Sequence, residues 1–360
     1  MFTAADHAHM ARALRLAERG LWTTTPNPRV GCVIVKAGEV VGEGWHVRAG
    51  EPHAEVHALR AAGDKARGAT AYVTLEPCSH HGRTPPCAEA LIDAGLARVV
   101  AAMTDPNPQV AGQGMQLLTL AGLRAEVGLL EAEACELNIG FISRMTRHRP
   151  WLRLKTASSL DGRTALANGA SQWITGPAAR ADVQRWRARA CAILTGIGTV
   201  RADDPRMNVR EFDTPRQPLR VIVDSGLNTP PGSRILGANT LVVGIDPQRR
   251  AAIEASGAEV LLMAPGPDGR IDLPLLLAEL ARRGCNEIHA EAGATLNGAL
   301  LRAGLVDEWL AYLAPVAMGN PARGLFDVPE LTAMSACPRF KTQDLRQLGD
   351  DIRLTLRPAT

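Results

Sequence analysis

Apolar positions in the first 147 residues switch between helical and strand-like spacing. Side chains at Met10, Ala13, Leu14 and Ala17 recur at the interval of an α-helix, which predicts a helix over residues 6–20. Two apolar runs around a turn at 37–39 predict a hairpin. Helices and buried strands then alternate. We expect strands at 30–35, 40–45, 71–75 and 97–103, a short strand near 125, and helices at 53–66, 86–95, 110–122 and 131–147.

The alternation restarts after the stretch Arg147-His148-Arg149-Pro150, which we interpret as a linker. Alternating strands and helices are typical of α/β sheets with helices on both faces. We therefore expect two α/β domains, residues 1–147 and 148–360. In the second, the pattern predicts strands at 151–156, 192–195, 219–224, 240–244, 259–263, 287–291, 308–314 and 352–356, and helices at 178–189, 273–283 and 296–303.

The first domain carries His53, Cys78 and Cys87 in an order that suggests a metal site. A zinc ion that carries out hydrolysis takes three protein ligands and leaves the fourth position for water. Glu55, on the first turn of a predicted helix, can transfer protons without being a ligand. Together these residues form the His-x-Glu, Pro-Cys, Cys arrangement of zinc deaminases. The alternative is that they are unrelated core positions, since a single cysteine is usually a small buried apolar side chain.

The spacing between the two cysteines departs from the common deaminase pattern, in which two residues separate them. Here residues 79–86 intervene, and they are polar and loop-forming. We expect this insert to touch whatever binds at the metal.

Composition narrows the classes of partner. The formal charge of +3 implies no polyanionic partner, and 4 % aromatic residues are too few for a base-stacking platform. The sequence has no apolar run long enough for a membrane span, and its first residues do not resemble a signal peptide. Seven cysteines without regular spacing argue against a disulfide scaffold, so a reducing cytoplasm fits best. The oligomeric state is open, and a homo-oligomer is compatible with the sequence.

The chain resembles the family of bifunctional riboflavin-biosynthesis deaminase/reductases over essentially its whole length. The resemblance is carried by residues 25–31, 52–55, 76–87, 159–164 and 203–205. It implies a cytidine-deaminase-like domain followed by a dihydrofolate-reductase-like α/β domain. It also implies one zinc ion per chain, NADPH, and a phosphorylated aminopyrimidine as the small-molecule substrate.

For the first domain, the resemblance assigns zinc to His53, Cys78 and Cys87, and the proton transfer to Glu55. The reaction implied is hydrolytic deamination of an aminopyrimidinone. Asn27 has the right chemistry to hold the ring edge. His46, Ser79 and His80 are further candidates for substrate contact, although each could equally be a turn-forming or surface residue.

For the second domain, the resemblance implies reduction of a ribosylamino group to ribityl, with Lys155 and Glu291 in acid or orienting roles. Arg187 and Arg210 could bind the substrate phosphate bidentately. Trp173 offers a flat face to the cofactor, or anchors the core. The substrate contacts implied are Ser171, Arg187, Met207, Arg210 and Glu291. The cofactor contacts implied are Ala157, Trp173, Thr199, Asp203, Ser225, Gly293, Ala294, Thr295, Leu296, Asn297, Gly298 and Ala299.

No Gly-x-Gly-x-x-Gly fingerprint follows the first strand of this domain, because Arg201 stands where Thr195-Gly196-Ile197-Gly198 would need the third glycine. A better candidate for binding the pyrophosphate is the strand-to-helix turn at 291–299, where unpaired N–H groups could hold an anion. An ordinary turn is the equally weighted alternative.

Two other functions stay open at this point. One is a tRNA or nucleoside deaminase with an unrelated C-terminal domain, which the near-neutral charge and low aromatic content disfavour. The other is a binding protein with a structural zinc, which would need a fourth protein ligand.

Overall fold

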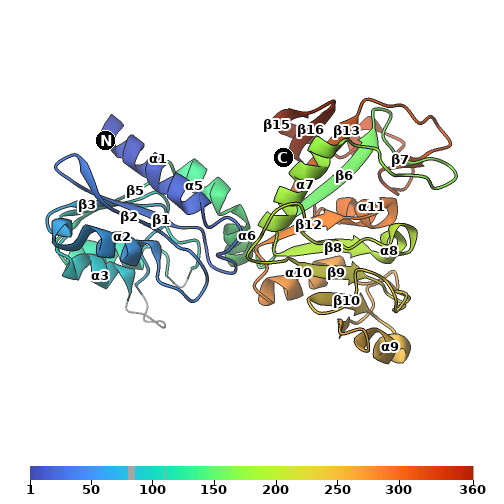
Figure 1. The fold of residues 1–360 in the computed structure, drawn as a ribbon, viewed down its shortest axis with the longest axis horizontal. Helices are drawn as coiled ribbons and strands as arrows, with labels where there is room; N and C mark the ends of the chain where they lie inside the picture. The colour runs from blue at the N-terminus through green and yellow to red at the C-terminus, as the bar shows by residue number, and fades with distance from the viewer. Residues whose placement is uncertain (80–85, 109, 360) are drawn as a thin grey trace. The chain divides into compact units, whose positions relative to one another are not determined.

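The structure, a computed structural model, describes residues 1–79, 86–108 and 110–359. The chain divides into two compact units, Met1–Arg149 and Pro150–Thr360 (Figure 1). This boundary lies two residues beyond the one expected from the sequence. Within the described part of the chain, no helix has both the length and the apolar character that crossing a membrane requires.

Unit 1 is built on a five-stranded sheet of order β2-β1-β3-β4-β5. β1 pairs antiparallel with β2 and β3, whereas β3, β4 and β5 are parallel. The strands are β1 (Gly31–Lys36), β2 (Glu39–Trp45), β3 (Thr70–Val73), β4 (Arg98–Ala101) and β5 (Arg124–Val127). The helices are α1 (Ala4–Glu18), α2 (Ala54–Ala62), η1 (Gly63–Ala66), α3 (Cys87–Asp93), α4 (Gln113–Leu120), α5 (Glu131–Leu137) and α6 (Ile139–Arg147).

Glycines let two helices approach opposite faces of this sheet. A Cβ on Gly31 of β1 would lie 2.0 Å from the carbonyl oxygen of Ala13 in α1. On the other face, a Cβ on Gly44 of β2 would lie 2.4 Å from the carbonyl oxygen of Ala54, the first residue of α2. Contacts this close exclude any side chain. Gly44 therefore lets the beginning of α2, where His53 and Glu55 lie, rest directly on the sheet.

The helix expected over residues 131–147 is two helices, because Asn138 interrupts it. Asn138 leaves the helical conformation, with φ −106° and ψ 18°. Its buried side chain accepts a hydrogen bond from the Arg29 backbone N–H at 2.8 Å and donates one to the Arg29 carbonyl at 2.9 Å. An asparagine amide can satisfy both backbone groups of one residue in this way, and apolar spacing alone does not reveal that role.

Unit 2 is built on a nine-stranded sheet of order β11-β10-β9-β8-β12-β6-β13-β16-β15. The strands up to β13 are parallel, and β16 and β15 add antiparallel at one edge. They are β6 (Trp151–Ser159), β8 (Ala192–Gly196), β9 (Leu219–Val223), β10 (Thr240–Gly244), β11 (Glu259–Leu262), β12 (Glu287–Glu291), β13 (Glu308–Ala314), β15 (Phe340–Leu348) and β16 (Asp351–Pro358). A separate pair consists of β7 (Arg163–Ala165) and β14 (Arg323–Gly324).

Helices cover both faces of this sheet. α10 and α11 pack on the apolar face that holds Leu152, Leu154 and Ile288. α7 lies over the opposite face, where buried Arg153 forms ion pairs with Glu287 and Glu308. The helices of the unit are α7 (Pro177–Arg189), α8 (Ile197–Asp203), η2 (Pro247–Arg249), α9 (Arg250–Glu254), α10 (Leu273–Arg282), α11 (Ala294–Arg302) and η3 (Met334–Ala336).

Strand β15 was not expected from the sequence. Most of its side chains are exposed, including Lys341, Thr342 and Gln343, so it lacks the apolar alternation that marks a half-buried strand. It forms because its backbone pairs with β16 along almost its whole length. Short α8 and α9, and the pair β7 and β14, were missed for a related reason, since few residues give little periodicity.

Candidate active sites

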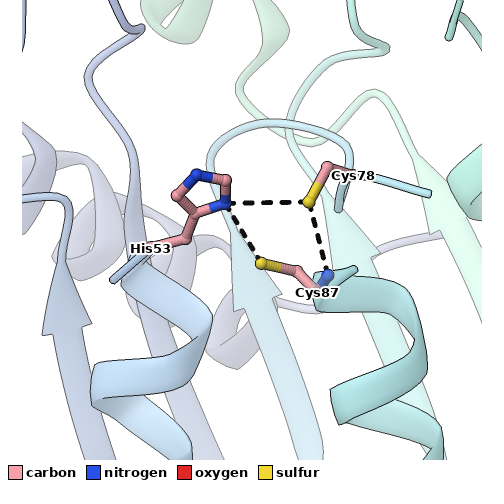
Figure 2. Close-up of side chains that lie close together, drawn as sticks. All are labelled: His53, Cys78 and Cys87. Carbon is pink, nitrogen blue, oxygen red and sulfur yellow. Dashed lines mark hydrogen bonds between the residues drawn. The ribbon is translucent and has the colours of Figure 1, made fainter. Parts of the chain in front are cut away.

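His53, Cys78 and Cys87 converge at one point of unit 1, and their ligand atoms all lie within 4.8 Å of one another (Figure 2). His53 is the N-cap of α2, and Cys87 is the first residue of α3. Cys78 follows the loop that leaves β3. Nδ1 of His53 lies 3.3 Å from Sγ of Cys87 and 3.7 Å from Sγ of Cys78. The three residues that the sequence singled out as ligands are therefore brought together.

This geometry fits zinc. With Zn–N near 2.0 Å and Zn–S near 2.3 Å, a tetrahedral ion separates its nitrogen and sulfur ligands by about 3.6 Å. The backbone N–H of Cys87 also donates to Sγ of Cys78 at 3.3 Å. Hydrogen bonds from Cys87 and His53 lower the pKa of Cys78 to about 4, while the same coupling raises the pKa of Cys87. The site thus stabilises thiolate, the form of cysteine that binds metal.

Glu55 lies beside these ligands but is not one of the three. Only 3 % of it is exposed, and burial raises its pKa to about 7. Its Oε2 has no hydrogen-bond partner among the described residues. A buried carboxyl that titrates near neutrality can both accept and return a proton, which is what a general acid–base group requires.

Asn27 and His46 are connected by a hydrogen bond that defines their roles. Burial lowers the pKa of His46, so its ring is neutral at neutral pH. Nδ1 of His46 donates to the carbonyl of Pro52 at 3.2 Å, so Nε2 is the acceptor for the Asn27 amide at 3.0 Å. His46, expected to contact substrate, is 1 % exposed and orients Asn27.

The remaining predicted contacts lie near the insert. Ser79 is half-buried, and its hydroxyl oxygen has no hydrogen-bond partner within the described ranges. His80 lies outside the described residues, as do residues 81–85 of the insert.

Glu76 has a role that the sequence reasoning missed. Its buried carboxylate accepts hydrogen bonds from four backbone N–H groups, those of Asp105, Gly112, Gly114 and Met115, at 2.8–3.2 Å. It thereby fixes the segment after β4 against the strand exit that carries Cys78. Only the proline and cysteine of the Glu-Pro-Cys sequence were used to predict the metal site, although a glutamate next to a buried strand end was a signal for such an anchor.

In unit 2, Glu291 is the last residue of the central strand β12, and basic side chains surround its carboxylate. Arg187 of α7 donates to it from Nε at 2.5 Å and from Nη2 at 2.9 Å. Nζ of Lys155 on the adjacent strand β6 lies 3.9 Å from Oε2. Despite burial, these cations hold the pKa of Glu291 well below its usual value, and burial lowers the pKa of Lys155. Three predicted site residues therefore form one cluster.

This cluster changes the interpretation of the two arginines. Arg187 is buried, and its Nη1 also donates to the carbonyl of Asn208 at 3.1 Å. Its Nη2 also faces the sulfur of Met207, a predicted substrate contact, at 3.9 Å. The geometry therefore favours Arg187 as the anchor of Glu291 over the phosphate role expected for it. Arg210 is exposed, and its backbone N–H is held by Gln184 at 3.0 Å.

The predicted cofactor residues fall into two groups. Gly293 is the N-cap of α11, and a Cβ there would lie 3.7 Å from the Thr199 hydroxyl, so these two face each other. Trp173 is 67 % exposed with the Arg180 guanidinium 4.7 Å above its ring, which excludes a core role. The other cofactor candidates in this group, half-buried or exposed, are Ala157, Asp203, Ser225, Ala294, Thr295, Leu296 and Ala299. Ser171, predicted to contact substrate, is half-buried.

Asn297 and Gly298 serve the fold of the α11 turn instead. The buried Asn297 amide donates to the carbonyls of Ala292 at 3.1 Å and Leu325 at 3.3 Å. A Cβ on Gly298 would lie 2.0 Å from the carbonyl oxygen of Asp327. Both residues therefore hold the segment 325–327 against the beginning of α11.

Two family descriptions match the chain, one in each unit. "Cytidine and deoxycytidylate deaminase zinc-binding region" matches residues 3–103, and "RibD C-terminal domain" matches residues 150–354. A zinc-binding deaminase unit followed by a RibD-type C-terminal unit is thus the class of protein that the fold and sites define.

Relatives match over the full length. The chain is 53 % identical to the riboflavin biosynthesis protein RibD of Escherichia coli, covering 98 % of this chain and 99 % of that one. The structure of Acinetobacter baumannii RibD has a TM-score of 0.92 at 48 % identity, covering 99 % of both chains. A diaminohydroxyphosphoribosylaminopyrimidine deaminase/5-amino-6-(5-phosphoribosylamino)uracil reductase from Thermotoga maritima has a TM-score of 0.87 at 33 % identity, with the same coverage. The chain belongs to the RibD family of riboflavin biosynthesis proteins.

Proposed function

We propose that this chain carries out two steps of riboflavin biosynthesis, a hydrolytic deamination and a reduction. The deamination acts on 2,5-diamino-6-(5-phosphoribosylamino)pyrimidin-4-one. The reduction converts the ribosyl side chain of 5-amino-6-(5-phosphoribosylamino)uracil to ribityl with NADPH. The observation that carries the proposal is the His53, Cys78 and Cys87 cluster with buried Glu55 in one unit, on a chain whose other unit gathers Lys155 and Glu291.

In the deaminase unit, His53, Cys78 and Cys87 would hold zinc. When bound, zinc supplies an acidified water molecule for attack on the ring carbon that bears the amine. Glu55 takes the proton of that water and returns it to the leaving ammonia, which its pKa of about 7 favours. Asn27, oriented by His46, holds the edge of the pyrimidine ring.

In the reductase unit, Thr199 and Gly293, which face each other at the beginning of α11, would help to hold NADPH. When bound, NADPH would supply a hydride for C1 of the ring-opened ribosylamino group. The cations around Glu291 lower its pKa and favour the ionised carboxylate, which disfavours Glu291 as the proton donor. We assign proton donation to the neighbouring Lys155, whose pKa burial lowers. Glu291 orients the Lys155 ammonium, and Arg210 binds the substrate phosphate.

A tRNA or nucleoside deaminase with an unrelated second domain is not favoured. The second unit matches the RibD C-terminal domain, and the relatives that match the whole chain are riboflavin biosynthesis proteins. Two assays on the purified chain test the proposal. The diaminopyrimidine substrate should release ammonia, and NADPH absorbance should then fall. The reductase half of the proposal would be contradicted if the chain releases ammonia from the diaminopyrimidine but oxidises no NADPH when the deaminated product is supplied directly.

A further inference from the structure

His289 is a buried residue that the proposed reduction does not yet use. It lies on β12 two residues before Glu291, and side chains two apart on a strand point to the same face of the sheet. It is 1 % exposed. Its Nε2 lies 3.4 Å from Oε1 of Glu291, on the carboxylate oxygen that also receives Nε of Arg187.

The surroundings of His289 keep its ring neutral. Burial lowers its pKa, and the charges of Arg187 and Lys155 add to that effect against the attraction of Glu291. Neither ring nitrogen has a hydrogen-bond partner in the part of the chain that the structure describes. A buried polar ring without a well-formed hydrogen bond costs folding free energy, so its presence beside a carboxylate calls for an explanation.

Strand register shows which groups His289 lies between. It is paired with Arg153 of β6 and Ile193 of β8, whereas Glu291 is paired with Lys155. Arg153 already forms ion pairs with Glu287 and Glu308. Ile193 is apolar. Glu287, two residues before His289 on the same face, is paired with Arg153 and Arg189. Glu291, 3.4 Å from Nε2, is therefore the carboxylate toward which His289 directs its N–H group.

We propose that His289 is a positioning residue of the reductase site. The ring directs its Nε2–H at Oε1 of Glu291 across 3.4 Å and, together with Arg187, helps to hold the plane of the carboxylate. With Oε1 held in this way, Oε2 stays directed at Lys155. Nζ of Lys155 lies 3.9 Å from Oε2, a contact loose enough for the ammonium to reach substrate as well. This inference rests on the proposed reductase activity, and it assigns His289 no contact with substrate or cofactor.

Two substitutions separate a positioning role from a packing role. His289→Leu fills similar space without a donor, and His289→Gln places an amide N–H about where Nε2 lies. For His289→Leu we expect the kcat of reduction to fall about tenfold, because the donor that faces the Glu291 carboxylate is lost. KM for NADPH and the deamination rate should be unchanged. His289→Gln should keep most of the kcat.

The free energy of unfolding distinguishes a positioning role of His289 from a packing role. Replacing a poorly bonded polar ring by an apolar side chain is close to neutral or stabilising, so His289→Leu should unfold no earlier than the parent. The matched control is Ile193→Val, paired with His289, which should lose stability without losing kcat. If His289→Leu does not fold, His289→Met is judged by the same criteria.

The proposal is overturned if an apolar variant at position 289 reduces at the parental kcat, or if His289→Gln is as slow as His289→Leu. A parent chain that oxidises no NADPH would instead contradict the proposed function. The two failures are therefore distinguishable.

Discussion

Arg187 and Glu291 form a bidentate ion pair across the α7 face of the reductase sheet, with N–O distances of 2.5 and 2.9 Å. Both side chains are buried. Removing one partner of such a pair leaves an unpaired charge in the interior, whereas removing both does not. The pair therefore links the stability of unit 2 to the geometry of its site.

We predict that Arg187→Ala lowers the free energy of unfolding by about 3–5 kcal/mol and reduces the kcat of reduction. The double variant Arg187→Met with Glu291→Gln should recover most of the stability and none of the activity. Urea unfolding and NADPH oxidation measure the two effects. If Arg187→Ala raises only KM for the phosphorylated substrate, at unchanged stability, Arg187 binds phosphate as the sequence suggested.

Arg210→Ala should behave differently, because this side chain is exposed. We expect weaker binding of the phosphorylated substrate by about 1.5–3 kcal/mol, from the loss of hydrogen bonds to a dianion. Stability should change by less than about 0.5 kcal/mol. Arg282→Ala, an exposed arginine on α10, is the control and should change neither quantity. An unchanged KM for Arg210→Ala would remove this residue from the site.

Cys87→Ser should remove most of the zinc and abolish deamination, because a hydroxyl is a poor replacement for a thiolate ligand. Cys135→Ser changes a half-buried thiol outside the cluster and should keep both. Elemental analysis and ammonia release provide the measurements. Full zinc in Cys87→Ser would require a different ligand set.

Asp6 should make the stability of unit 1 depend on pH. Burial alone would raise its pKa, but hydrogen bonds from Arg98, Tyr72 and Thr3 outweigh burial and lower it well below its usual value. The unfolded state therefore binds the proton first. The stabilisation is complete above about pH 4 and is lost as pH falls toward the folded-state pKa.

Asp6→Asn should accordingly cost about 2–3 kcal/mol at pH 7, the worth of hydrogen bonds to a buried charged group. The difference between parent and variant should shrink as pH falls below about 4. Denaturant unfolding at several pH values tests this. A difference that stays constant down to acid pH would show that Asp6 acts through shape alone.

The zinc site could be predicted from sequence because its chemistry is local. His53 and Glu55 lie on one helical turn. Cys78 follows a strand and Cys87 begins a helix, so the sequence motif alone indicates that these side chains meet. The pairing of Arg187 with Glu291 could not be predicted, because those residues lie 104 positions apart and the pair depends on how α7 lies over β12. Strand β15 could not be predicted because its exposed side chains show no apolar periodicity. The break between α5 and α6 could not be predicted because it depends on the hydrogen bonds of Asn138 to Arg29, which is distant in the sequence.

The two chemistries belong to separate sets of residues in this proposal, and Glu55→Gln tests that separation. The amide keeps the size of the side chain but cannot accept and return a proton, so deamination should fall by about 10²–10⁴-fold. Zinc should remain bound. The reciprocal variant Glu291→Gln should lose reduction and keep deamination.

The decisive measurement is NADPH oxidation by Glu55→Gln when 5-amino-6-(5-phosphoribosylamino)uracil is supplied directly. If the two sites work separately, we expect reduction at close to the parental rate. Reduction that collapses together with deamination, in protein that is folded and loaded with zinc, would contradict it.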